Sequence, residues 1–383
     1  GTIEGELLLK RQFGIEDGQL LTIFDTDVVS QDAYLQSVLG TVGADRLREI
    51  VTTIQAEQNF VIRHKPDRPL IVQGVAGSGK TTIALHRIAY LLYAYQDRMS
   101  PEQMMILAPS PLFLDYISGV LPDLGVDRVV QTTFPLLIGG LLGKKLPRVD
   151  ATDRLGELLE LDEDARARLN RVLRRKGSLD TLRQLDAFMD DYERAFATHA
   201  AVVYGPATIL TPEQVYKFFM EDCKPFPLER RLTEFGKLLK QQVRAAVDEV
   251  ENYLMDMCDR KVDKLCRTMP DGEERRAKVR KLFDQRDAQI KHAHTGVNEF
   301  VKGVLASFPK LSALDAYREF WRRQGGEAGE YTLQHATARS VESEDIAPLC
   351  VIAARMFALK RLDIRHLVID EAQDFSPMEF MLL

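Results

Sequence analysis

Residues 74–82 read GVAGSGKTT, and this stretch decides the fold. The pattern G-x-x-x-x-G-K-[ST] is matched by Gly74, Gly79, Lys80 and Thr81. An apolar run at 69–74 precedes the stretch, and a helix-like pattern follows it. In such a loop the glycine amides surround a phosphate, the lysine neutralises the outer phosphates and the hydroxyl ligates Mg²⁺. The sequence therefore predicts a triphosphate-binding loop, and a tight glycine-rich turn without a ligand is the alternative.

A pair of adjacent carboxylates follows a second apolar run, IRHLVIDEAQD, at residues 364–374. We expect a buried strand that delivers Asp370 and Glu371 to one end of a sheet. The first carboxylate would then hold a magnesium ion, and the second would orient or deprotonate the attacking water. Alone, such a pair is usually a solvated strand end. Together with a phosphate loop, it predicts hydrolysis of a nucleoside triphosphate.

The sequence around these motifs is typical of an α/β domain. Short apolar runs at 69–74 and 104–109 flank a helical pattern, which predicts two buried strands of a parallel βαβ unit. We assign this domain to residues 41–145 and 331–383. Residues 1–40 contain GELLLKRQFGIEDGQLLTIFD, which predicts a β-hairpin followed by a linker helix.

The two halves of the α/β domain are separated by a charged, helix-patterned insertion at residues 146–330. Within it, apolar residues recur every three or four positions on both sides of the break MPDGE. This pattern predicts a long antiparallel helical hairpin at about 228–306. At about 1.5 Å per residue, its first helix of roughly 40 residues would extend about 60 Å as an arm.

The composition argues against a non-specific DNA-binding protein, a disulfide- or zinc-stabilised protein and a membrane-spanning protein. The formal net charge is −6 with 45% hydrophobic residues, so no global cationic field favours non-specific DNA binding. Four scattered cysteines without a C-x-x-C pair argue against disulfides and structural zinc. The apolar runs are too short for a membrane span. We expect a cytoplasmic protein with neither membrane nor zinc among its partners.

Two signals have ordinary explanations. The basic run RARLNRVLRRK at 166–176 is flanked by acidic residues, so a charged helix face is favoured over nucleic-acid contact. His292 and His294 are two residues apart and would face different directions on a helix. We therefore interpret both histidines as solvated.

The motifs GVAGSGKTT and VIDEAQD, with a glutamine upstream, resemble those of the UvrD/Rep-like superfamily 1 helicases, in which Asp-Glu-x-Gln-Asp is the Walker B motif. Further blocks are similar to the HelD family, bacterial ATPases that bind RNA polymerase. These blocks are GELLLKRQFGIEDGQLLTIFDTD, TIQAEQNFVIR, ALHRIAYLLY, ILAPSPLFLDYISGVLPDLGVDRVVQTTF and IRHLVIDEAQDFSP. The resemblance implies a RecA-like P-loop domain with a parallel sheet, a bacterial cytoplasmic location, ATP and Mg²⁺ as cofactors and RNA polymerase as partner.

The resemblance also implies roles for single residues. It assigns Gln58, or alternatively Gln55, to reading adenine, and Gly74, Gly77, Gly79, Lys80, Thr81 and Thr82 to the phosphate loop. Thr81 and Asp370 would hold the metal, and Lys80, Glu371 and Gln373 would take part in catalysis. Gln373 would couple the γ-phosphate to domain movement. Ser110 lies where related enzymes contact single-stranded nucleic acid, and a helix cap is its alternative role.

The implied activity is ATP-driven remodelling of RNA polymerase, in which arms displace nucleic acid and recycle the polymerase. The alternatives are a superfamily 1 helicase or translocase that acts on single-stranded DNA in repair, and a binding module with an idle nucleotide site. The resemblance places a second RecA-like domain after the acidic pair and an N-terminal coiled-coil arm before the hairpin. We therefore expect this chain to be a fragment that binds ATP but hydrolyses it poorly.

Overall fold

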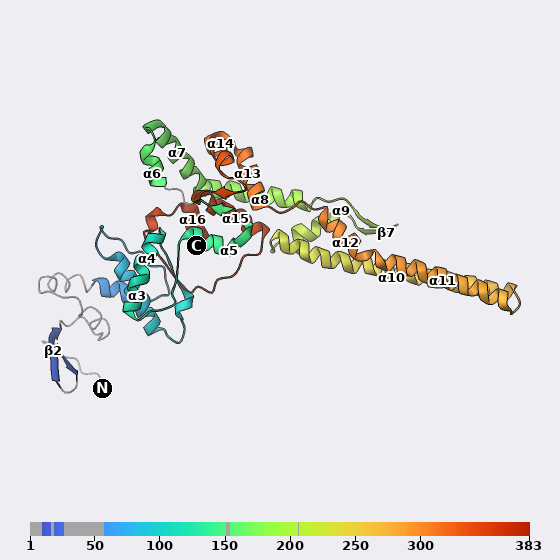
Figure 1. Ribbon diagram of the computed structural model, residues 1–383, viewed down its shortest axis with the longest axis horizontal. Helices are drawn as coiled ribbons and strands as arrows, with labels where there is room; N and C mark the ends of the chain where they lie inside the picture. Colours follow the sequence, from blue (N-terminus) through green and yellow to red (C-terminus); the bar gives the residue numbers. More distant parts are fainter. Residues whose placement is uncertain (1–9, 17–18, 27–56, 151–153, 206) are drawn as a thin grey trace. The chain divides into compact units, whose positions relative to one another are not determined.

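The computed structural model (Figure 1) describes residues 10–16, 19–26, 57–150, 154–205 and 207–383. The chain is mostly helical and carries a small parallel sheet. It divides into two compact units. The first comprises Gly1–Leu136 and Leu362–Asp374, and the second comprises Leu137–Arg361 and Phe375–Leu383.

The predicted N-terminal β-hairpin is confirmed. Strands β1 (Lys10–Glu16) and β2 (Gln19–Thr26) pair antiparallel, with Lys10 opposite Thr26. The predicted linker helix lies outside the described residues. The described chain resumes as a helix over residues 57–63.

A three-stranded parallel sheet forms the core of the first unit. Its order is β4-β3-β9, with β4 at Val130–Thr132, β3 at Met104–Leu107 and β9 at His366–Ile369. Every residue of β3 is buried, and helix α4 (Pro111–Val120) connects it to β4. Helix α3 (Lys80–Ala94) packs on the same core through Leu85, Ile88 and Leu91. The sheet thus brings a chain segment from near residue 370 beside one from near residue 107.

The prediction of a buried strand at 69–74 is wrong. Residues 69–75 have no regular secondary structure, and the Ile71 side chain is 91% exposed. The parallel βαβ unit is formed instead by β3, α4 and β4. An apolar run forms a strand only where it pairs with a sheet edge, and residues 69–75 pair with neither outer strand of the sheet β4-β3-β9. Pro69 in addition offers no backbone N–H for a ladder.

The second unit contains the predicted helical hairpin (Figure 1). Helix α10 (Leu228–Thr268) has 41 residues and extends about 60 Å, since each residue of a helix rises about 1.5 Å. The chain returns as α11 (Glu273–Thr295) and, after an interruption at Gly296, as α12 (Val297–Ala306). Most buried residues of α10 lie in its first half, and none of the described residues of α11 is buried. The hairpin is therefore an arm, as predicted, although its return is broken.

The rest of this unit is a helical body around the hairpin's base. Its helices are α5 (Phe134–Leu142, which begins in the first unit), α6 (Arg154–Glu160), α7 (Glu163–Lys176), α8 (Leu179–Ala197), α9 (Pro212–Lys217), α13 (Ala313–Gln324), α14 (Gly326–His335), α15 (Ile346–Met356) and α16 (Pro377–Leu382). Its strand pairs are β5 (Arg148–Val149) with β8 (Ser340–Val341), parallel, and β6 (Val202–Tyr204) with β7 (Ala207–Leu210), antiparallel. Helix α15 packs on α8 and α13. The second unit covers Leu137–Arg361 and Phe375–Leu383, whereas the sequence predicted an insertion at 146–330. Among the described residues, no helix combines the length and the apolar character that a membrane span requires.

Candidate functional site

The glycine-rich loop has a backbone that only glycine adopts easily. Gly77 and Gly79 have positive φ angles of 77° and 80°, in the left-handed region. A Cβ atom on Gly74 would lie 2.6 Å from the Ser78 hydroxyl oxygen, so a side chain there would force a displacement. The Ser78 amide donates to the Val75 carbonyl at 3.2 Å and closes the turn. The loop therefore has the tight backbone that phosphate binding by amides requires.

Helix α3 starts directly at the residues predicted to hold phosphate and metal. Gly79 is its N-cap, and Lys80, Thr81 and Thr82 form its first turn. The Lys80 ammonium donates to the Gly74 and Val75 carbonyl oxygens, each at 3.0 Å, and so lies over the loop. Thr82 is exposed. The positive end of the helix and a lysine charge thus lie at one place, an arrangement that favours an anion.

Thr81 and Asp370 are brought into direct contact from positions 289 residues apart. The Thr81 hydroxyl donates to one carboxylate oxygen of Asp370 at 2.8 Å. The Asp370 amide donates to the Leu107 carbonyl at 3.0 Å, which continues the pairing of β9 with β3. Asp370 is buried, at 9% exposure. A hydroxyl and a carboxylate in contact form the oxygen-only donor set that Mg²⁺ prefers, so these residues fit that ion.

The remaining acidic-pair residues form a tight turn after β9. Glu371 has a φ of 48°, which is uncommon for a residue with a side chain. Its amide donates to the second carboxylate oxygen of Asp370 at 3.0 Å, and its carboxylate accepts a hydrogen bond from the Gln373 side chain. The Asp374 amide donates to the Glu371 carbonyl at 2.9 Å. Strained backbone of this kind is concentrated at functional sites, and here it turns Glu371 away from the strand direction.

Gln58 lies beside the phosphate loop. Its side-chain nitrogen is 3.9 Å from the position that a Cβ atom on Gly79 would occupy. The buried Arg87 of α3 links that helix to the segment that follows Gln58. Its guanidinium donates to the carbonyl oxygens of Val61, Ile62 and His64 at 2.9, 3.1 and 2.6 Å. The alternative residue, Gln55, lies outside the described residues. Arg87 was not predicted as a site residue, since an arginine on a helix pattern resembles an ordinary surface charge.

A second unpredicted feature is an open pocket of about 680 Å³ next to Gln58. Its lining consists of Asn59, Phe60, Arg63, His64, Lys65, Asp67 and Arg68. The Phe60 ring is 70% exposed there, although an aromatic ring in a helix pattern usually lies in a core. An exposed ring beside cationic side chains can stack on a planar aromatic ligand. Only the exposure of Phe60, which the sequence does not reveal, distinguishes it from a core residue.

Ser110 occupies the N-cap position of α4 with an extended backbone, but its side chain makes no capping hydrogen bond. Ser110 therefore stands at the helix-cap position, but its side chain does not cap the helix. Burial lowers the pKa of His86, a half-buried residue of α3, so this imidazole is neutral near pH 7. This agrees with a packing role.

Half of the basic residues in the run of α7 form ion pairs within their own unit. Arg171 forms an ion pair with Glu327 at 3.0 Å, and Arg175 forms one with Asp180. Lys176 is fully buried, 2.7 Å from a carboxylate oxygen of Asp345. Arg166, Arg168 and Arg174 are exposed, so the run presents a charged helix face in which some arginines are paired with carboxylates and others face solvent.

The site therefore consists of a tight glycine loop, a lysine at a helix N-terminus, and a hydroxyl–carboxylate contact between two segments that are distant in the sequence. No protein-family model matches the chain, and no curated protein matches it either.

Proposed function

We propose that this chain binds Mg²⁺–ATP and is the first RecA-like half of an ATPase of the superfamily 1 type. The contact between Thr81 and Asp370 at 2.8 Å carries the proposal, because a phosphate loop becomes a hydrolytic site only if a carboxylate reaches its hydroxyl. The sequence resemblance assigns both residues to one metal site, and in the structure their side chains are in contact. The strained turn at Glu371 adds a second carboxylate beside the first.

In this proposal each residue has a defined role. The loop amides and Lys80 bind the β- and γ-phosphates, while Thr81 and Asp370 hold Mg²⁺. The bound ion would neutralise charge on the phosphates and fix their orientation. Glu371 accepts a proton from the attacking water, and Gln373, which is hydrogen-bonded to Glu371, responds to the γ-phosphate.

The pocket beside Gln58 suits the base of the nucleotide. Gln58 can both donate to and accept from an adenine edge through its amide. Phe60 offers an exposed ring for stacking, and Arg63 and Lys65 line the same pocket. The Asn59 side-chain oxygen is buried and has no hydrogen-bond partner among the described residues, so it is available to a bound donor.

We further propose that the complete protein remodels RNA polymerase, as the resemblance to the HelD family implies. An arm of two helices with little buried surface beyond its base is suited to insertion into a cleft of a larger partner. A net charge of −6 argues against a chain that tracks DNA by phosphate contacts alone. The alternative is a helicase or translocase on single-stranded DNA.

Co-precipitation with core RNA polymerase separates these two functions. We expect this chain to bind the polymerase stably and to bind single-stranded DNA only weakly. The affinity for single-stranded DNA should fall steeply between 50 and 200 mM salt, by about 300-fold for six phosphate contacts. A hairpin deletion that joins Val250 to Thr295 should remove polymerase binding and retain ATP binding. Tight DNA binding without polymerase binding would instead establish the alternative.

A further inference from the structure

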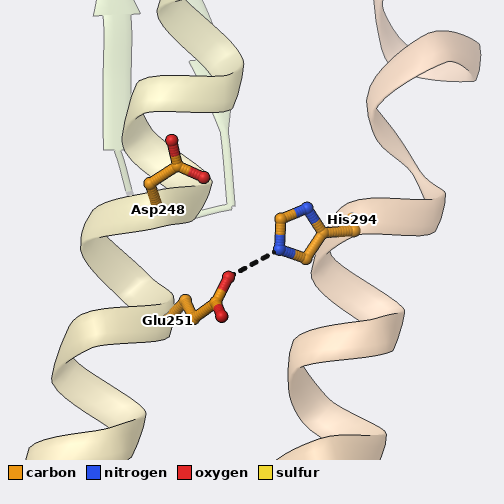
Figure 2. A group of neighbouring side chains, drawn as sticks. All are labelled: Asp248, Glu251 and His294. Atoms are coloured by element: carbon orange, nitrogen blue, oxygen red, sulfur yellow. Dashed lines mark hydrogen bonds and ion pairs between the residues drawn. The ribbon is translucent and has the colours of Figure 1, made fainter.

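The helical hairpin carries three potential metal ligands that the nucleotide site does not use. Asp248 and Glu251 lie on α10, and His294 lies at the end of α11 (Figure 2). One ligand atom of each residue lies within 4.8 Å of those of the other two. We propose that these side chains bind a divalent transition-metal ion of the zinc class, which fastens α10 to α11.

The arrangement arises from helix geometry. Asp248 and Glu251 are three residues apart on α10, so they share one face of that helix. His294 reaches them from the antiparallel helix, and its Nε2 lies 2.8 Å from a carboxylate oxygen of Glu251. His294 is exposed, as expected for a solvated histidine, but it also makes this hydrogen bond to the facing helix. In the sequence, His292 is the only nearby residue with which His294 could share a metal ion. The residues that lie beside His294 in the structure are more than forty residues away along the chain.

The donor set selects a class of ion. An imidazole with two carboxylates suits Zn²⁺, Co²⁺ or Ni²⁺, whereas Mg²⁺ and Ca²⁺ prefer oxygen ligands alone. The Asp248 carboxylate makes no hydrogen bond or ion pair with any other described residue, so it is free to turn toward the ion. The single partner of the Glu251 carboxylate among these residues is His294. Among the described residues no lysine or arginine forms an ion pair with either carboxylate, although Lys240 and Arg244 line the same surface hollow as Asp248, so both carboxylates can turn toward a bound cation.

Small side-chain rotations complete the site. A tetrahedral ion with bonds of about 2.0–2.2 Å needs its ligand atoms about 3.3 Å apart. Asp248 and His294 are exposed, so their rotamers can change at little cost. His294 would bind through Nε2 as the neutral tautomer with its hydrogen on Nδ1, and two metal–ligand bonds would replace its hydrogen bond to Glu251. Water would fill the fourth position.

The backbone beneath His294 is already fixed. The Tyr204 hydroxyl donates to the Ala293 carbonyl at 2.8 Å, and the Tyr204 ring lies against Phe300 of α12 with centroids 4.8 Å apart. These contacts hold the last turn of α11 just before the interruption at Gly296. A metal ion there would stiffen the hairpin at the point where its return helix is broken.

The test is a titration of the whole chain, free of nucleotide, with Co²⁺ and separately with Zn²⁺. The experiment uses a Cys266→Ser background, because Cys266 is an exposed thiol and thiolates are ligands for such ions. We expect one ion per chain and a Co²⁺ absorption spectrum typical of nitrogen and oxygen ligands. Since weaker second-shell changes already cost 10- to 100-fold, His294→Ala and Asp248→Ala should each lower the affinity by about a hundredfold.

His292→Ala is the matched control, since it removes an exposed histidine of the same helix that lies outside the cluster. It should leave metal binding unchanged. Asp370→Asn should do the same, because it removes the carboxylate that would hold a metal ion in the nucleotide site and leaves the hairpin cluster intact. Circular dichroism of each variant verifies that the helices persist. Unchanged affinity in folded His294→Ala, or no stoichiometric binding by the parent chain, would overturn the proposal.

Discussion

Replacing Lys80 with alanine should lower the affinity for ATP by at least a hundredfold. The Lys80 ammonium lies over the loop and would exchange its two carbonyl contacts for phosphate oxygens. Hydrogen bonds between charged groups contribute about 1.5–3 kcal/mol each, so losing two corresponds to a factor of about a hundred or more. Binding of a fluorescent ATP analogue, followed by anisotropy, measures the change directly.

Lys310→Ala is the control for this variant, because Lys310 is an exposed lysine far from the loop in sequence and lies in the helical unit. It removes the same charge and should bind ATP as the parent does. If Lys80→Ala kept the parental affinity while remaining folded, residues 74–82 would be a glycine-rich turn and not a phosphate loop.

Glu371→Gln should stop ATP turnover in the complete protein and leave ATP binding intact. The substitution keeps the size and the hydrogen-bonding capacity of the side chain but removes the carboxylate that accepts a proton from water. General-base catalysis contributes about 10²–10⁴-fold to such reactions, so we expect kcat to fall by about a thousandfold. Phosphate release under saturating ATP measures turnover, and the anisotropy assay measures binding.

If Glu371→Gln still hydrolysed ATP at the parental rate, a residue other than Glu371 would be the general base. Glu379→Gln serves as the comparison, since Glu379 follows the same strand but its carboxylate accepts from the Ser376 amide in the capping box of α16. Burial raises the pKa of Glu379, which makes it a plausible rival base on chemistry alone. A loss of turnover in Glu379→Gln, with normal turnover in Glu371→Gln, would assign the role to Glu379.

The local motifs could be predicted from the sequence because they depend on short-range chemistry. Positive φ angles at Gly77 and Gly79, and the start of α3 at Lys80, follow from the glycine spacing. The long hairpin was predictable in the same way, since a period of three to four persists through α10. Each of these features is decided within a few turns of chain.

Pairing between distant segments was harder to predict. The run at 69–74 has the composition of a buried strand, yet nothing in it specifies a partner edge, and β3 pairs with β4 and β9 instead. The roles of Arg87 and Phe60 depend on which side chains are exposed or enclosed, and the partners of His294 lie on another helix. Such relationships become visible only when the chain is folded.

The most direct test of the central claim, one Mg²⁺–triphosphate site shared by Thr81 and Asp370, is ATP affinity with Mg²⁺ and with EDTA for the parent and for Asp370→Asn. Asparagine keeps an acceptor for the Thr81 hydroxyl, so the turn should persist while the metal loses its charged ligand. We predict that Mg²⁺ raises the affinity of the parent about tenfold or more, and that this gain disappears in Asp370→Asn, whose affinity in EDTA matches the parent's. An equal Mg²⁺ effect in both proteins would contradict the account.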